Sequence, residues 1–326
     1  MATIRDVARE CGLSISTVSI VLNGKASERK IPSETAQHVL DTASRLKYRP
    51  NRAARILRGI TQRPVVALFW VLDNRSSFFL RVVSGLETVF NDQKTPCDLV
   101  IHPYENGKLR EHEHLLLSRD YDAILIGALS TDDLTYLESL QPTVPVYLIN
   151  RLSERFRGCS TDPEQIGAAA ADWILGCGCQ TLAFVADQDA VVPKTTRRNA
   201  VIAACRKRGI LSNEALMIYS PNNISGGMEA AQQILSIKQR PDMIFVDNDV
   251  LALGLSLGLH MREEINIPIL CIALNHPDLN RRLLPTLSFI DIPGERIGRE
   301  SAIQICNLLY LQRELENVVC RCEIAK

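Results

Sequence analysis

Three short polar side chains near the N-terminus can form hydrogen bonds and lie close together at the expected start of a helix. Ser14, Ser16 and Thr17 follow Gly12, and a glycine permits the sharp turn that would separate two short helices. The first side chains of a helix in the DNA major groove reach base edges, and short polar groups beside them bond phosphates. A helix, a glycine turn and a second helix therefore predict DNA recognition through the major groove.

Three short helices would have to position these residues. The first helix starts after Thr3, and the second runs from Ser14 to about Leu22. The third starts near Ser33 and stops before Pro50. Apolar residues at helical spacing predict one small shared core, made of Ile4, Val7, Ala8, Val18, Val21, Leu22, Val39, Leu40, Ala43 and Leu46.

The charge of the chain is unevenly distributed although the net charge is zero. Residues 1–63 contain 12 Lys and Arg against 5 Asp and Glu, a net of +7. The remaining residues contain 37 − 12 = 25 basic against 37 − 5 = 32 acidic side chains, a net of −7. A basic segment attached to an acidic body directs a polyanion such as double-stranded DNA to the N-terminal part.

Beyond residue 64, apolar runs alternate with amphipathic helical stretches such as 163–175 and 224–237. Continuous apolar strands alternating with helices predict parallel sheets that helices cover on both faces. The number of runs predicts an α/β body of two doubly wound parallel-sheet lobes. The apolar runs are 65–71, 98–102, 123–128, 144–149, 181–186, 216–219, 243–246, 269–274, 287–290 and 318–322.

Several function classes lack their motifs in this chain. No Gly-x-Gly-x-x-Gly follows the first strand and no Walker-type Gly-Lys-Thr/Ser occurs, so we expect no nucleotide cofactor. His-Glu-x-x-His is absent, and we expect no Gly-x-Ser-x-Gly nucleophile elbow, so the chain is not expected to be an enzyme. No apolar run reaches the ~20 residues of a membrane span, and no secretory stretch opens the chain, which favours a cytoplasmic location without a membrane partner.

The ten cysteines are expected to be reduced and mostly buried. Two Cys-x-Cys pairs, at 177/179 and 320/322, raise the question of a metal site. No histidine lies near either pair at zinc-site spacing, so we expect no metal.

Two segments of the sequence resemble the lactose-repressor (LacI/GalR) family of bacterial transcription regulators. The first is Thr3-Ile4-x-Asp6-Val7-Ala8, continued by Gly12-x-Ser14-x-x-Thr17-Val18-Ser19 and Val21-Leu22-Asn23-Gly24. The second is Tyr48-x-Pro50-Asn51-x-x-Ala54-Arg55-x-Leu57. Weaker similarities continue at Phe78-Phe79, Asn150-Arg151, Asp162, Arg197, Asn248-Asp249 and Gly298-Arg299.

The resemblance implies a helix-turn-helix head, a hinge helix and a body with two lobes shaped like periplasmic sugar-binding proteins. A small effector would bind between the lobes, and a homodimer, formed mainly through the first lobe, would present two heads to a near-palindromic operator. The implied domains are the head at 1–50, the hinge helix and linker at 51–63, and the body at 64–326, with lobe 1 at 64–159 and 292–317 and lobe 2 at 160–291 and 318–326.

Within the head, the resemblance assigns DNA contacts to the second helix. Ile15 and Ser16 would face base edges, and Ser14, Thr17 and Asn23 would bond phosphates. An isoleucine is ordinarily a core residue, but its place at the start of a groove helix favours exposure of Ile15.

One residue of the second helix departs from the family. Ile20 stands where the family usually has an arginine that reads guanine with a bidentate pair. Isoleucine donates no hydrogen bond, so it either packs on a thymine methyl group or faces away. We therefore expect a half-site that differs from the usual family sequence.

The hinge helix of the family folds on operator DNA. By resemblance, Asn51 caps this helix, Arg52 and Arg55 lie near phosphates, and Leu57 is the wedge inserted at the central minor-groove step.

For the effector site, the resemblance points first to an arginine. Arg197 is the family's effector-anchoring position, although its neighbour Arg198 competes for that role. Asn248 would supply an amide contact, and Asp249 is expected to cap the next helix. Asp162 is a further candidate for the effector site.

Two amides stand where many sugar-responsive members carry aspartates. These are Asn150 and Asn275, and their replacement leaves a less acidic pocket. The effector is then either an anion, such as a sugar phosphate or sugar acid, or a neutral ligand held by amides. Phe78 and Phe79 would either stack on a flat ligand face or fill the space between lobes.

The main hypothesis is thus a ligand-responsive, dimeric transcriptional repressor. A solute-binding protein of the periplasmic type is the first alternative, since the body shares that architecture. A family member that kept its DNA head but lost effector response is the second. An enzyme on an α/β scaffold is the third, and turnover of a bound ligand would reveal it.

Overall fold

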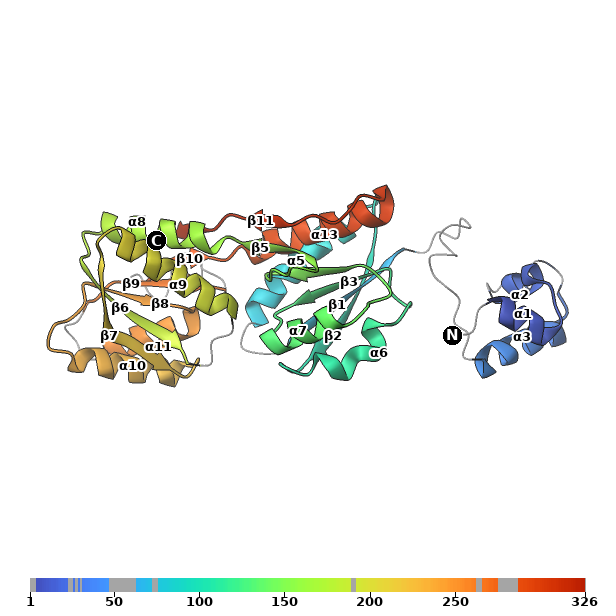
Figure 1. Ribbon diagram of the computed structural model, residues 1–326, viewed down its shortest axis with the longest axis horizontal. Coiled ribbons are helices and arrows are strands. Elements are labelled where there is room, and N and C mark those ends of the chain that lie inside the picture. Colours follow the sequence, from blue (N-terminus) through green and yellow to red (C-terminus); the bar gives the residue numbers. More distant parts are fainter. Residues whose placement is uncertain are drawn as a thin grey trace. The chain divides into compact units, whose positions relative to one another are not determined.

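The computed structural model describes residues 4–22, 26, 29, 31–46, 63–71, 76–188, 192–261, 266–274 and 287–325. The chain separates into two compact units, Met1–Gln62 and Arg63–Lys326 (Figure 1). We refer to the first unit as the head and to the second as the body.

The head contains three helices around a small apolar core. They are α1 (Ile4–Cys11), α2 (Ile15–Leu22) and α3 (Ser33–Arg45). The core is formed by Val7, Ala8, Val18, Val21, Val39 and Ala43, all of which are at most 5% exposed. These residues lie at the helical spacing that the sequence predicted, so the three-helix arrangement is confirmed. The expectation that Leu40 belongs to this core is wrong, because Leu40 is 46% exposed on the outer face of α3.

The turn between α1 and α2 depends on a backbone conformation that favours glycine. Gly12 has φ 65°, in the left-handed region. The amide of Leu13 donates to the carbonyl of Ala8 at 3.0 Å, which closes α1. Ser14 Oγ then accepts a hydrogen bond from the amide of Thr17 at 3.0 Å. Ser14 therefore caps the start of α2, as its position after the turn predicted.

The body contains two six-stranded sheets. The first has the strand order β11-β5-β4-β3-β1-β2, and every neighbouring pair in it is parallel. Its strands are β1 (Val65–Val71), β2 (Asp98–Tyr104), β3 (Ala123–Gly127), β4 (Val146–Ile149), β5 (Arg157–Thr161) and β11 (Val318–Cys320).

The second sheet repeats this arrangement with one change. Its order is β12-β10-β9-β8-β6-β7, and β12 pairs antiparallel with β10 while the other pairs are parallel. Its strands are β6 (Thr181–Asp187), β7 (Leu211–Ser220), β8 (Met243–Val246), β9 (Ile269–Ala273), β10 (Leu287–Asp291) and β12 (Glu323–Ala325).

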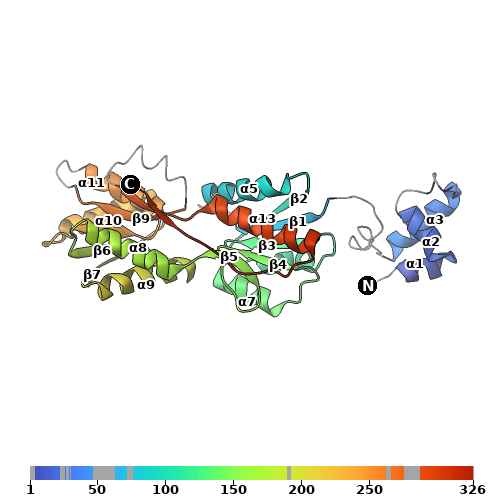
Figure 2. The ribbon, with the colours of Figure 1, turned by 90° about the horizontal axis from the view of Figure 1, so that it is seen from above.

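Helices cover both faces of each sheet, which confirms the doubly wound fold class. Figure 2 shows α5 and α13 together on one face of the first sheet and α7 on the other. Around the second sheet, α8 packs against α9 and α10 packs against α11. The helical elements are α5 (Ser76–Phe90), η1 (Leu109–His112), α6 (Glu113–Leu116), α7 (Thr131–Ser139), α8 (Pro163–Gly176), α9 (Val192–Lys207), α10 (Ile224–Ser236), α11 (Asp249–His260) and α13 (Gly294–Leu311).

The strands near the C-terminus and the extent of the first sheet differ from what the sequence predicted. The expected strand 318–322 ends at Cys320 as β11, and a separate strand, β12, follows at Glu323–Ala325. β11 pairs with β5 in the first sheet, whereas β12 pairs with β10 in the second. The assignment of 318–326 to lobe 2 is therefore wrong for Val318–Cys320, and the first sheet also extends through β5 to Thr161. The chain crosses between the sheets after β5, after β10 and between β11 and β12.

Most cysteines are buried free thiols, as expected. Seven of the ten are buried, and Cys177 is exposed. Burial raises the pKa of Cys205 to about 11 and that of Cys322 to about 12, so both are protonated at neutral pH. Within the described part of the chain, no group of three or more His, Cys, Asp or Glu is arranged to hold a metal ion.

Residues 254–258 spell Gly-x-Ser-x-Gly, yet they form no nucleophile elbow. They lie inside α11, and Ser256 is 1% exposed. An elbow requires a strand-to-helix turn that exposes the serine. Over the described residues, moreover, no helix combines the length and apolar character required to cross a membrane.

Close contact between α5 and α13 depends on two glycines. A Cβ at Gly298 would collide with the carbonyl oxygen of Val82, and one at Gly85 would collide with that of Glu295. Both obstacles are backbone atoms, which cannot move aside without separating the helices.

Gly298→Ala is therefore expected to destabilise the body by about 1–3 kcal/mol, because the added methyl group overpacks the contact between the helices. Gly176→Ala is the matched control, since no atom lies within 4 Å of a Cβ at that position. Denaturant unfolding monitored by circular dichroism measures both variants. Equal stability of the two would contradict the assigned role of the glycine contact.

Candidate DNA-binding face and effector pocket

Helix α2 divides its residues between the core of the head and the solvent. Val18 and Val21 are buried, while Ser14, Ser16 and Ile15 are exposed, Ile15 at 44%. An exposed isoleucine at a helix start contributes little to its own fold. This observation favours the groove-facing interpretation of Ile15 over a core role.

The other expected DNA contacts fall into two groups. Thr17 and Ile20 are half-buried, and Ile20 is not among the described residues that pack against the core of the head. The Oγ1 of Thr17 lies 2.8 Å from Ser14 Oγ, so the two hydroxyls are adjacent. The remaining candidates, Asn23, Asn51, Arg52, Arg55 and Leu57, lie outside the described residues.

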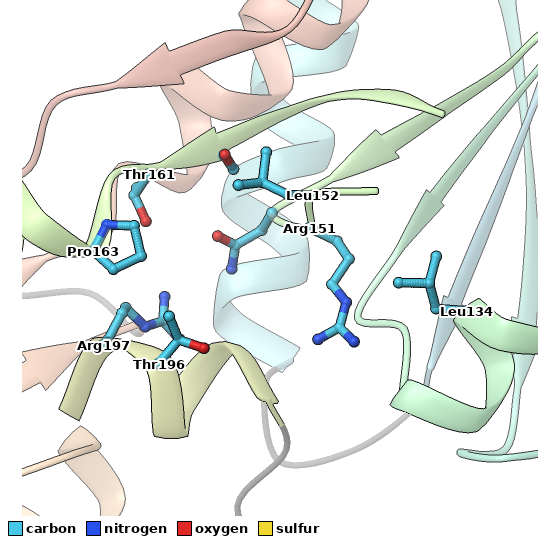
Figure 3. Close-up of a pocket in the computed structure, with 9 residues that line it drawn as sticks. Leu134, Arg151, Leu152, Thr161, Pro163, Thr196 and Arg197 are labelled. Carbon is cyan, nitrogen blue, oxygen red and sulfur yellow. The ribbon is translucent and has the colours of Figure 1, made fainter. Parts of the chain in front are cut away.

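The body contains a cavity of about 310 Å³ where loops and helix starts of both lobes meet. That volume is within the range of small-ligand sites. Figure 3 shows Thr161, Pro163, Thr196 and Arg197 on one side, facing Arg151 and Leu134 on the other. The described residues that line the cavity are Leu134, Asn150, Arg151, Leu152, Ser160, Thr161, Pro163, Thr196 and Arg197.

The described residues that line this pocket carry positive charge. Arg151 and Arg197 are 7% and 4% exposed, respectively. The other polar lining residues are one amide and three hydroxyls, and none of the described lining residues is Asp or Glu. Burial lowers the pKa of Arg151 below its ordinary value, because the charged form loses hydration. The pocket thus offers cationic and neutral donors to a ligand.

The structure separates the roles of the two adjacent arginines. Arg197 lines the cavity. Arg198 Nη1 instead donates to Asp247 Oδ2 at 3.2 Å, and its guanidinium lies 5.6 Å from the ring centroid of Tyr219. The sequence analysis left both open, and Arg197 is the one in position to meet a ligand.

Asn150 also lines the cavity, at the end of β4. Its φ is 55°, in the left-handed region that asparagine tolerates better than most residues. Its amide donates to the carbonyl of Cys159 at 2.7 Å, which holds the turn against β5. Of the seven expected effector residues, Asn150 and Arg197 are thus brought together.

Two of the other candidates serve as helix caps. Asn248 Oδ1 accepts from the amide of Leu251 at 2.9 Å, and its Nδ2 donates to Asp247. The expectation that Asp249 is the cap is wrong, because α11 begins at Asp249 and a cap must precede the first helical residue. Asp162 likewise caps α8 by accepting from the amide of Glu164 at 2.9 Å. Neither Asn248 nor Asp162 is part of the described pocket lining.

The aromatic candidates pack within the first lobe. Phe78 is 2% exposed and lies 6.0 Å from the ring of Trp70, and Phe79 lies 5.3 Å from the same ring. These contacts place both rings against Trp70 within the first lobe, an arrangement that differs from both expectations, stacking on a ligand and filling the space between the lobes. Asn275 is outside the described residues.

Sequence reasoning missed most of the pocket. Arg151 was noted only as part of a family similarity, and Ser160 and Thr161 lie on β5, which has no apolar run. The one available signal was the position of Arg151, directly after a strand that was predicted. Side chains there lie at the carboxyl edge of a parallel sheet, where ligands bind.

An ion pair between Arg81 of α5 and Asp291 at the end of β10 connects the two lobes. Arg81 Nη1 and Nη2 donate to Asp291 Oδ1 and Oδ2 at 2.9 and 2.8 Å. Arg81 Nη1 also donates to the carbonyl of Leu274 at 3.2 Å. Arg81 belongs to the first lobe, whereas Asp291 ends a strand of the second. This bidentate pair therefore holds one relative position of the lobes.

A helical head with an exposed helix after a glycine turn, followed by a two-lobed α/β body, is the architecture of a DNA-binding transcription regulator. Comparison with known proteins agrees. Residues 3–51 match the model of bacterial regulatory proteins of the lacI family, and residues 171–323 match the periplasmic binding protein-like domain. The chain thus joins a domain of the lacI family of bacterial regulatory proteins to a periplasmic binding protein-like domain.

Individual relatives are similar along most of the chain. The transcriptional repressor PurR of Vibrio vulnificus is 26% identical over 92% of this chain and 90% of its own length. A LacI family transcription regulator from Clostridium acetobutylicum matches 81% of this chain and 99% of its own, with 25% identity and a TM-score of 0.74. A lac repressor dimer bound to operator and an anti-inducer shares the fold over 100% of this chain and 98% of its own, at 19% identity and a TM-score of 0.68.

Arg81→Gln and Asp291→Asn are each expected to destabilise the body by about 1–3 kcal/mol, because each leaves a charge-assisted partner unsatisfied. The double variant should lose less free energy of unfolding than the two single variants lose together, since the two residues share one interaction. The exposed pair Lys108–Glu105 is the control and should show almost no coupling. Additive losses at Arg81 and Asp291 in denaturant unfolding would contradict a direct bond between the lobes.

Proposed function

We propose that this chain is a sequence-specific transcriptional repressor that binds a near-palindromic operator as a homodimer and responds to a small effector. The exposed start of α2 carries the proposal. Ser14, Ile15 and Ser16 present two hydroxyls and one apolar side chain directly after the Gly12 turn, on a helix whose other face is buried. This is the arrangement that enters a major groove.

The relatives support the regulatory part of the proposal. PurR of Vibrio vulnificus is named a transcriptional repressor, and the lac repressor structure is described as a dimer bound to its operator. The net charge of +7 in residues 1–63 adds attraction for phosphates that is independent of sequence. Repression, dimer formation and a two-fold operator are properties that we extend to this chain.

The effector would bind in the cavity between the lobes, as a sugar, a sugar phosphate or a sugar acid. Because Arg197 comes from one lobe and Arg151 from the other, a ligand touching both favours one relative position of the lobes. A ligand shifts such an equilibrium only by its difference in affinity for the two positions. That difference would alter how two heads engage DNA.

Selection of binding sequences from random DNA by the full-length chain tests the proposal. We expect an enriched near-palindrome whose affinity falls steeply with salt. Ile15→Ala and Ser16→Ala should weaken the selected site by about 1–3 kcal/mol each, because both side chains face base edges. Gln37→Ala on α3, where Gln37 bonds Asp41, should leave affinity unchanged. Enrichment of no sequence would favour a solute-binding protein instead.

Ile20→Arg tests how α2 meets the bases. An arginine at this place should form a bidentate pair with guanine and shift one position of each half-site toward G·C by about 1–3 kcal/mol. Ile20→Leu keeps the apolar character and should retain the original preference. If Ile20→Arg leaves every position of the selected half-site unchanged, residue 20 does not face the groove.

A further inference from the structure

Two polar atoms of the effector pocket are buried without a hydrogen-bond partner. They are Arg151 Nη1 and Ser160 Oγ. Both residues are more than nine-tenths buried, and both line the cavity. Buried donors of this kind ordinarily have partners, and a missing partner costs more for a charged group than for a neutral one. A ligand in the cavity is in place to supply both partners.

The surroundings of Arg151 do not neutralise it. Among the described residues, no carboxylate lies within ion-pair distance of its guanidinium. Glu138 acts on Arg151 through space, but its own Oε1 accepts from Ser153 Oγ at 2.6 Å. Arg198, by contrast, is compensated by Asp247. Arg151 is thus a desolvated cation whose charge faces a cavity.

The described polar residues that line the cavity with Arg151 can donate hydrogen bonds, and none of these lining residues is Asp or Glu. Arg197 lines the same cavity from α9, and Ser160, Thr161 and Thr196 place hydroxyls along it. An oxygen-rich anion accepts from all of these groups, and guanidinium binds phosphate or carboxylate in a two-pronged geometry. A neutral sugar would leave the charge of Arg151 uncompensated.

Building on the proposed function, we propose that the effector is an oxyanion, either a phosphate monoester or a free carboxylic acid of a small metabolite. Arg151 and Ser160 hold its charged group, and Arg197 contacts it from the other lobe. The shared chemistry is a group with at least two acceptor oxygens and a negative charge. A phosphorylated sugar and a sugar acid are the two sources of that chemistry.

Thermal melting of the full chain with four probes tests this site. The probes are orthophosphate, glucose 6-phosphate, gluconate and glucose, each against potassium chloride of equal ionic strength. Binding to the folded state raises the melting temperature by mass action. We expect a saturable rise with oxyanions and none with glucose. A larger rise with phosphates than with gluconate assigns a phosphate ligand, and the reverse assigns a carboxylate.

Variants locate the effect. Arg151→Gln should weaken oxyanion binding at least tenfold, and Ser160→Ala should weaken it several-fold. Arg155→Gln is the matched control, because Arg155 is exposed on the same loop and stacks on Phe156. Without ligand, Arg151→Gln should melt no lower than the wild type, since it removes a buried charge that lacks a partner. A purely structural arginine would lower the melting temperature instead.

The proposal is overturned if glucose alone stabilises the chain, if no oxyanion does so beyond chloride, or if Arg151→Gln binds oxyanions like the wild type. Measuring the DNA affinity of the same samples distinguishes failure of the anionic effector from failure of the proposed regulatory function. DNA affinity that persists while oxyanions have no effect leaves the regulator intact and removes only the anionic effector.

Discussion

The geometry of parallel strands is the constraint on which the body depends. Neighbouring parallel strands need a crossover connection, and the crossover helices must cover both faces of the sheet. Every strand of such a sheet then ends at the same edge. The pocket follows directly, because Asn150 and Arg151 come after β4, Thr161 ends β5 and Arg197 lies on the helix after β6. Side chains distant in sequence therefore meet without any special local feature.

A second consequence is the coupling of the lobes. Three crossings of the chain and the bidentate pair of Arg81 with Asp291 join the two sheets. One apolar cluster also includes buried residues of both lobes, such as Trp70 of the first and Phe184 of the second. The pocket between the lobes contains buried arginines, and burying their charge costs free energy. Arg151 Nη1 is buried without a hydrogen-bond partner, and under our proposal a bound anion would supply one and offset the cost of desolvation. In the proposed effector site, binding and lobe position would be linked through this side chain.

The periodicity of apolar residues predicted most helices and strands but few of the residues that line the pocket. The core of the head and nearly all strands of the body carry apolar residues at the spacing of their element, so they could be predicted. The strand β5 could not, because Gly158, Ser160 and Thr161 are small or polar and are buried only by their neighbours. Asn248 and Asp249 show a second limit, since a one-residue shift of a helix start exchanges a cap for a helical residue.

By itself the sequence determined the class of this protein. The glycine turn, the polar start of the second helix and the alternation of strands and helices are local patterns, and local patterns are visible in one dimension. Only the tertiary structure decided that Arg197 and not Arg198 lines the pocket, that Phe78 and Phe79 pack on Trp70, and that Arg151 and Ser160 share a cavity. The physical reason is that burial, charge compensation and pocket membership are set by neighbours from distant parts of the chain.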